Sequence, residues 1–176
     1  MQKLKEKLLS DMPARKKVSV HKPYVCEWKE REVYAMKIEN DGGDGKYNGY
    51  YIVFYVIGMD RGEYVVSGVY DMVPKVYLML SEKKIEKAED IKKLDLCCCV
   101  FNKEKNEGGI VYIIPETSNR NKPKMMEYIG RLKNNFIPKV EYQISNNIGD
   151  LMWHSIVSNA IRYYEFNLKI KQIRDE

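Results

Sequence analysis

The chain has few cysteines and histidines, which are the residues that most often carry covalent or metal chemistry, and its four cysteines are not arranged for either. Cys26 stands alone, and Cys97, Cys98 and Cys99 are contiguous. No Cys-x-x-Cys pair is present, and neighbouring residues on one strand cannot surround a tetrahedral zinc ion. We therefore expect reduced, buried thiols rather than a redox centre, with no bound metal and no cofactor.

Histidine is equally scarce, because the whole chain contains two. His21 lies beside Lys22 and Pro23 in a basic stretch, which is a poor position for a catalytic group. His154 lies near the start of the last predicted helix. It would act as a general base only if it faced a cleft, alone or paired with the thiol of Cys99. The sequence therefore predicts no catalytic residue, and an enzyme that uses His154 is the weakest alternative.

The glycine-rich segment at residues 40–45 lacks the features of the ion-binding and phosphate-binding loops. Its sequence is Asn-Asp-Gly-Gly-Asp-Gly. An EF-hand requires a regular series of ligands that ends in a glutamate, and a P-loop requires Gly-Lys followed by Ser or Thr. Neither pattern is present, so the segment is predicted to be a turn between two strands.

Long apolar runs are also absent. No run approaches the about 20 apolar residues that a membrane-spanning helix needs. Lys3, Lys5, Glu6 and Lys7 interrupt any apolar core near the N-terminus, and no small-residue cleavage site follows them. These absences predict a cytoplasmic protein without a membrane segment.

Positive charge is present in modest excess, with a formal net charge of +5. It is concentrated in residues 3–22, which form a basic arm. Such an arm can follow the phosphates of a nucleic acid, and it can equally be a solvated leader, so both interpretations stay open. The candidate partner-binding residues of the arm are Arg15, Lys16, Lys17 and Lys22.

Two loops supply the remaining binding candidates. Residues 117–122 are polar throughout and form the best candidate binding loop, since loops carry function more often than the scaffold does. Arginine can hold a carboxylate or a phosphate with two hydrogen bonds. Arg61, Arg120 and Lys122 therefore complete the predicted partner-binding set, with an ordinary surface role as the alternative for each.

Aromatic composition and periodicity predict a sheet. The chain has 14 tyrosines and only 4 phenylalanines, and tyrosine suits half-buried strand positions. Residues 50–57 are almost continuously apolar, which predicts a central strand covered on both faces. A turn is expected at residues 59–62, followed by a hairpin partner at 63–70. Further strands are predicted at residues 33–38, 75–80, 96–101, 110–114 and 125–129, with a turn at 106–109.

Helical spacing appears in three places. Residues 2–9 have helical composition, and residues 82–94 place Ile85, Ala88 and Ile91 on one face. The last helix is predicted to begin at Leu151 with Asp150 as its N-cap. The apolar residues that follow its period are Trp153, Ile156, Val157, Ala160, Ile161, Tyr164 and Leu168.

Together these elements predict an α+β fold. A bent antiparallel sheet or small β-barrel-like core would carry a short middle helix and a long C-terminal helix. Residues 1–23 would form the N-terminal helix and basic arm, and residues 24–176 a single α+β domain. The predicted core consists of Val33, Ile52, Phe54, Val56, Val76, Leu78, Val100, Ile113, Ile129, Ile156 and Ile161.

The order of these elements resembles the immunity protein 26 family of small bacterial proteins. The resemblance covers residues 20–135, including the predicted helix at 82–94. It rests on Lys22-Pro23, Trp28-Lys29, Val33-Tyr34-Ala35-Met36-Lys37, Gly49-Tyr50-Tyr51-Ile52-Val53, Pro74-Lys75-Val76-Tyr77 and Tyr128-Ile129-Gly130. Members accompany secreted polymorphic toxins, and the resemblance implies neutralisation of such a toxin by direct binding. It supplies no catalytic residues. The three contiguous cysteines and the lysine-rich loop at residues 103–106 depart from the pattern.

Two main functional hypotheses follow. The first is a binding protein that inhibits another protein, such as a toxin or a nuclease effector, as an immunity protein or a phage-type counter-defence inhibitor. Its positive charge argues against mimicry of nucleic acid and favours an acidic target surface. The second is a small basic β-barrel module that binds nucleic acid through its arm, with Tyr50, Tyr64 or Tyr77 stacking on bases. The sequence leaves the oligomeric state open.

Overall fold

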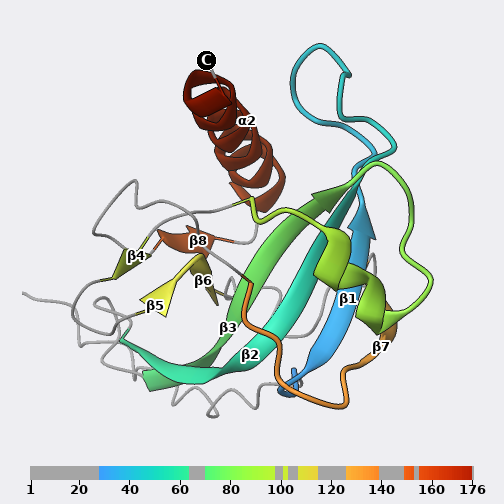
Figure 1. The fold of residues 1–176 in the computed structure, drawn as a ribbon. Helices are drawn as coiled ribbons and strands as arrows, with labels where there is room; N and C mark the ends of the chain where they lie inside the picture. The colour runs from blue at the N-terminus through green and yellow to red at the C-terminus, as the bar shows by residue number, and fades with distance from the viewer. Residues whose placement is uncertain are drawn as a thin grey trace, which may run out of the picture.

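The central feature of the fold is a six-stranded sheet, seen here in a computed structural model. The structure describes residues 28–63, 70–97, 101–102, 107–114, 126–138, 149–152 and 155–175. The strand order is β7-β1-β2-β3-β6-β8 (Figure 1). All pairs are antiparallel except β6 and β8, which are parallel. The strands are β1 (Glu32–Lys37), β2 (Tyr51–Glu63), β3 (Tyr70–Ser81), β6 (Ile110–Ile114), β7 (Met126–Arg131) and β8 (Gly149–Met152).

The sheet is open, so the β-barrel alternative is wrong and the α+β class with an antiparallel sheet is confirmed. β7 and β8 form its two ends and are not paired with each other. A separate two-stranded ribbon is formed by β4 (Phe101–Asn102) and β5 (Glu107–Gly108). The helical elements of the described residues are a 3-10 helix, η1 (Ala88–Lys93), and a long α-helix, α2 (Ile156–Asp175).

β2 is buried on both faces, as its nearly continuous apolar sequence predicts. Ile52 and Phe54 belong to one cluster of buried side chains, and Val53 and Tyr55 belong to another. This alternation follows from the two-residue period of a strand. β2 lies between β1 and β3, which pair with its two edges, and the two clusters cover its faces.

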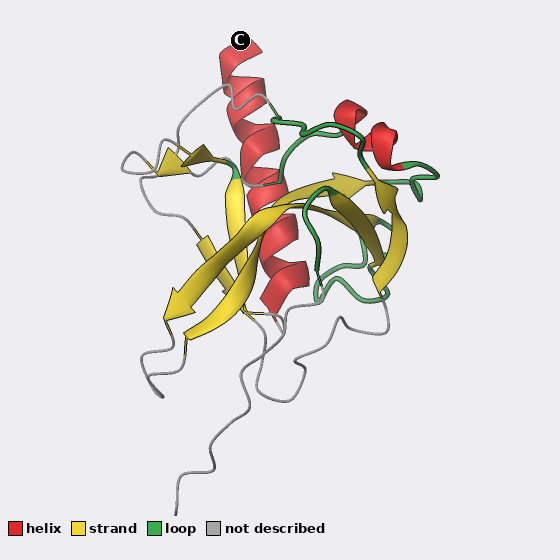
Figure 2. Cartoon of the chain, turned by 90° about the horizontal axis from the view of Figure 1, so that it is seen from below, coloured by secondary structure: helices red, strands yellow, loops and turns green. Residues whose placement is uncertain are grey.

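Each face of the sheet has its own cover. α2 packs Ile156 and Ala160 against the first cluster, while η1 packs Ala88 and Ile91 against the second. Figure 1 and Figure 2 show the two helical elements on different sides of the sheet. The functional consequence is that α2, which is held to the sheet along one side, keeps its other side facing outward.

The expected α-helix over residues 82–94 is not confirmed. In its place η1 forms a single short 3-10 helix, Ala88–Lys93. Ile85, Ala88 and Ile91 are all buried and recur every three residues. Ala88 and Ile91 lie within η1, whose repeat of three residues keeps both on the sheet, while Ile85 precedes the helix.

The turn predicted at residues 59–62 and the return strand at 63–70 are wrong. β2 continues to Glu63, and Met59 faces Pro74 of β3. A β-bulge between Val56 and Gly58 lets the two strands stay paired beyond this point. The glycines that suggested a tight turn therefore lie within a long, bent hairpin.

The predicted start of the last helix is also wrong. Asp150 is not an N-cap, because residues 149–152 form β8 and pair with β6. α2 begins at Ile156 instead. A parallel partner for β6 lies far away in sequence, so local helical spacing could not indicate it. Of the strand expected at 96–101, Leu96 makes an isolated bridge to Met79 and Phe101 begins β4, while residues 98–100 lie outside the described part of the structure.

Most of the predicted core is confirmed where side chains are described. Ile129 and Ile161 are partly buried against the two clusters. Val100 and the side chain of Ile113 lie outside the described part of the structure. The fully or almost fully buried members are Val33, Ile52, Phe54, Val56, Val76, Leu78 and Ile156.

Candidate protein-binding surface

The inner side of α2 is fixed to the body of the protein by a buried polar side chain. The Asn167 amide nitrogen donates to the backbone carbonyls of Leu96 at 2.8 Å and Cys97 at 2.6 Å. Lys171 adds an ion pair to Asp95, with Nζ and Oδ2 2.9 Å apart. Among the described residues, Asn167 is the one buried polar residue. The side of α2 that carries Asn167 is therefore the side that faces the body of the protein.

The opposite side of α2 exposes apolar and basic side chains in alternation. Phe166 is 46% exposed and Ile173 is 72% exposed. Arg162 and Lys169 are exposed between and beside them. The four residues recur at intervals of four, three and four, which places them on one helix face. We call Arg162, Phe166, Lys169 and Ile173 the α2 outer face.

A preorganised loop lies beside α2. It connects β1 to β2, and the Asp41 carboxylate organises it by accepting three backbone N–H groups. The donors are Gly43 at 2.9 Å, Gly45 at 3.2 Å and Tyr47 at 3.0 Å. The hydrogen bonds from the Tyr47 and Gly43 backbones lower the pKa of Asp41 below its ordinary value. The Asp41 carboxylate therefore ties three positions of the loop backbone together.

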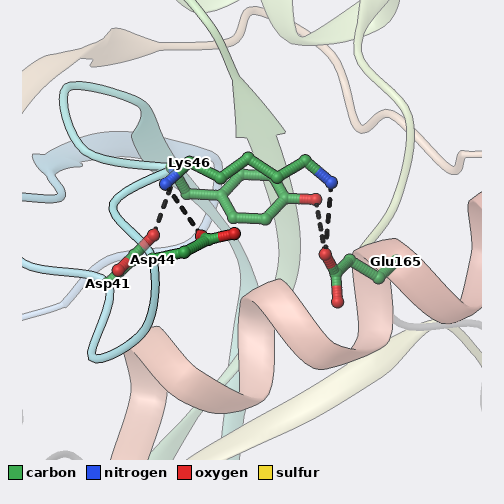
Figure 3. A network of polar contacts seen from close by, with 5 residues as sticks. Asp41, Asp44, Lys46 and Glu165 are labelled. Carbon is green, nitrogen blue, oxygen red and sulfur yellow. Dashed lines mark hydrogen bonds and ion pairs between the residues drawn. The ribbon is translucent and has the colours of Figure 1, made fainter.

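Glu165 joins this loop to α2. One of its carboxylate oxygens, Oε1, lies 3.3 Å from Lys46 Nζ and accepts a hydrogen bond from the Tyr47 hydroxyl at 3.1 Å (Figure 3). The Tyr47 ring packs edge-on against Tyr164, with ring centres 6.3 Å apart. Burial raises the pKa of Tyr47, so its hydroxyl stays a donor to Glu165. The loop is therefore fixed to α2 through Glu165 and Tyr164.

The loop is a turn, as predicted, and its acidic side chains serve its own backbone. Asp41 uses both oxygens on N–H groups, and Asp44 accepts from the Lys46 backbone at 3.1 Å. Within the residues that the structure describes, no three histidine, cysteine or acidic side chains are grouped so that they could hold a metal ion. In that same part of the chain, no helix is both long enough and apolar enough to cross a bilayer.

Most of the predicted site residues fall outside the described part of the structure. This applies to His154 and to the partner-binding candidates Arg15, Lys16, Lys17, Lys22, Arg120 and Lys122. Arg61 is not in a loop: its backbone lies in β2 and faces Met72, and its side chain is not described. Cys97 is a buried free thiol, as predicted for the cysteines. The predicted partner-binding set therefore stays a prediction, apart from the strand position of Arg61.

The α2 outer face was missed by the sequence reasoning, although the sequence contained a signal. Phe166 and Ile173 fall outside the apolar period that runs through Ile156, Ala160 and Tyr164. An apolar residue off the buried period of an amphipathic helix is a candidate for an exposed contact. The contact between Glu165 and Tyr47 had no comparable signal, since these residues are 118 positions apart.

No protein-family model, curated protein or solved structure matches this chain. The resemblance to the immunity protein 26 family therefore stays a prediction that depends on the sequence pattern. Function has to be argued from the surface itself.

Proposed function

We propose that this protein is a non-enzymatic binding protein that inhibits another protein by forming a direct complex with it, as an immunity protein or a phage-type counter-defence inhibitor. The proposal rests on the α2 outer face. Two large apolar side chains stand exposed there on a helix that is fixed from behind by Asn167 and from the side by Glu165. Exposed apolar side chains on a rigid element favour association with another surface.

The α2 outer face combines the residue types that are common at protein–protein interfaces, namely large apolar side chains and arginine. Phe166 and Ile173 would act as anchors, and since both are partly buried already, burying the rest of each contributes less than the about 1.5–3 kcal/mol of a fully exposed side chain. Arginine and aromatic residues are the types that most often dominate interface energies. The helix is already ordered in the free protein, so little conformational entropy is lost on binding.

The positive charge of the α2 outer face favours a partner with an acidic surface. Arg162 and Lys169 are both exposed, and neither has an ion-pair partner among the described residues. A target with acidic side chains around an apolar depression would neutralise them. This agrees with the net charge of +5, which disfavours a mimic of nucleic acid. We therefore propose a toxin or nuclease effector that is bound through an acidic surface.

The test uses the purified chain and each protein encoded by the genes that flank its own. Titration calorimetry measures affinity and stoichiometry, and the activity of the flanking protein is assayed in parallel. We expect a stoichiometric complex that survives moderate salt, has an interface of standard size, and abolishes that activity. Phe166→Asp or Ile173→Asp should weaken binding by more than about 30-fold.

The matched control is Ile137→Asp. Ile137 is 78% exposed, more than Ile173, but it follows β7 and is not part of α2. This variant should bind as tightly as the native chain. Equal losses for the Ile137 and Ile173 variants, or a complex without inhibition, would contradict the proposal.

A further inference from the structure

A second surface lies at the β7 end of the sheet, away from α2. Residues 29–32 and 131–133 lie side by side there. The Leu132 backbone donates to the Arg31 carbonyl at 3.0 Å, and Arg131 Nε donates to the Glu30 carbonyl at 3.1 Å. Arg31 Nη1 in turn donates to the carbonyl of Lys133. The two guanidinium groups are thus held in place by opposite segments of backbone.

This region carries four basic side chains, Lys29, Arg31, Arg131 and Lys133, which we call the basic corner. None of them has an ion-pair partner among the described residues. The acidic side chains of the same two segments are Glu30 and Glu32, and the Glu32 carboxylate accepts from the Lys29 backbone and the Tyr34 hydroxyl. Within the described part of the structure, the remaining guanidinium and ammonium donors have no anionic partner.

Arg31 occupies a conformation that favours glycine. Its φ is +70°, and it is the only non-glycine residue with a positive φ in the described part of the chain. Such a conformation is strained for a residue with a side chain, and it is typical of functional sites. Glycine would fit this turn without strain, so the turn itself does not account for arginine.

An exposed aromatic ring lies on the same side of β7 as Arg131. Tyr128 faces Tyr34 across the β1–β7 pair, and Arg131 faces Glu32. The Tyr34 hydroxyl donates to Glu32, so all four side chains share one face. Tyr128 is 54% exposed, and its ring is supported edge-on by Tyr34 at 5.6 Å. It therefore presents a fixed aromatic surface to solvent.

We infer that the basic corner and Tyr128 bind single-stranded nucleic acid. The arginines and lysines would contact phosphates, and a base would stack on Tyr128. Aromatic rings reach bases only where the bases are not stacked within a duplex, so the site favours a single strand. Among the tyrosines predicted to stack, Tyr77 is buried and Tyr50 packs against Tyr47, while Tyr64 lies outside the described residues.

The experiment measures fluorescence anisotropy of a labelled oligothymidylate of about 15 nucleotides, titrated with the full chain over a series of salt concentrations. Tyr128→Ala should weaken binding by about tenfold, and Tyr128→Phe should not. Arg131→Ala should weaken binding and lower the log–log salt slope by about 0.7. Lys83→Ala is the matched control, because Lys83 is exposed without an ion pair among the described residues and follows the far end of β3.

The Arg31→Gly variant tests whether a loss of oligonucleotide affinity can occur without a loss of stability. Because glycine relieves the positive φ, this variant should keep or increase its resistance to urea while it loses affinity for the oligonucleotide. The inference is overturned if a duplex of the same length binds as tightly, if Tyr128→Ala binds like the native chain, or if Lys83→Ala loses as much affinity as Arg131→Ala. None of these outcomes bears on the α2 outer face.

Discussion

At the scale of single residues, Asp41 determines the shape of the β1–β2 loop. Three backbone donors converge on its carboxylate, and the hydrogen bonds from the Tyr47 and Gly43 backbones lower its pKa below the ordinary value of an aspartate. Folding thus favours the ionised form. The contribution of Asp41 to stability is complete above the ordinary pKa and is lost as the pH falls through the lowered one.

We therefore expect Asp41→Asn to be less stable than the native chain near neutral pH and to approach it in acid. Urea unfolding between about pH 6 and about pH 2 measures this, since the difference in unfolding free energy should shrink toward the acid end. Asp44→Asn is the control, because Asp44 accepts from a single backbone group, that of Lys46. A pH-independent difference between Asp41→Asn and the native chain would show that the charge of Asp41 does not hold the loop.

At the scale of the elements, the orientation of α2 depends on Asn167. Replacing it with leucine keeps the volume but leaves the carbonyls of Leu96 and Cys97 without this donor in a buried site. We expect the free energy of unfolding to fall by about 1–3 kcal/mol, measured by urea denaturation. Asn159→Leu on the same helix should cost less, because Asn159 donates to Ser155 within its own turn. Equal costs would mean that Asn167 does not hold the helix in place.

The elements also show how far sequence could predict this fold. The central position of β2 and the inner face of α2 followed from periodicity, because burial on both faces or on one face leaves a local pattern. Asp150 was predicted to be a helix N-cap and Met59 to lie in a turn, but both lie in strands. Each strand is fixed by pairing with another strand, Asp150 with Tyr112 and Met59 with Pro74, and such pairing leaves no local pattern. The spacing of Ile85, Ala88 and Ile91 correctly indicated that all three are buried, but only Ala88 and Ile91 lie in a helix, and it is a 3-10 helix.

The candidate sites were harder to predict than the fold. The α2 outer face can be recognised only once the inner face is known, and the basic corner joins residues about 100 positions apart, as the contact of Arg131 with Glu30 shows. Arg61 was predicted to bind a partner because of its charge and its expected position in a loop, but it lies in β2. Exposure, rather than residue type alone, separates Phe166 and Tyr128 from the other aromatic residues whose side chains the structure describes.

At the scale of the whole molecule, an open sheet has ends that a closed barrel lacks. An unpaired edge strand can bind the edge of another copy, and natural proteins oppose this with bulges and charges. β7 has both. Ile129 has no partner in the register between β1 and β7, which marks a bulge, and Glu127 forms an ion pair with Lys84 at 2.7 Å. The edge is therefore protected against uncontrolled pairing.

Removing these charges should expose the edge. We expect the double variant Lys84→Val, Glu127→Val to self-associate with increasing concentration, while the native chain does not, as measured by light scattering after size-exclusion chromatography. The control is Glu89→Val, Lys92→Val, which removes one charge of each sign from exposed positions on η1. Both variants keep the net charge and gain two valines, so only the position of the change differs. If the two self-associate equally, added surface hydrophobicity is the cause; if neither does, the bulge at Ile129 is sufficient to protect the edge.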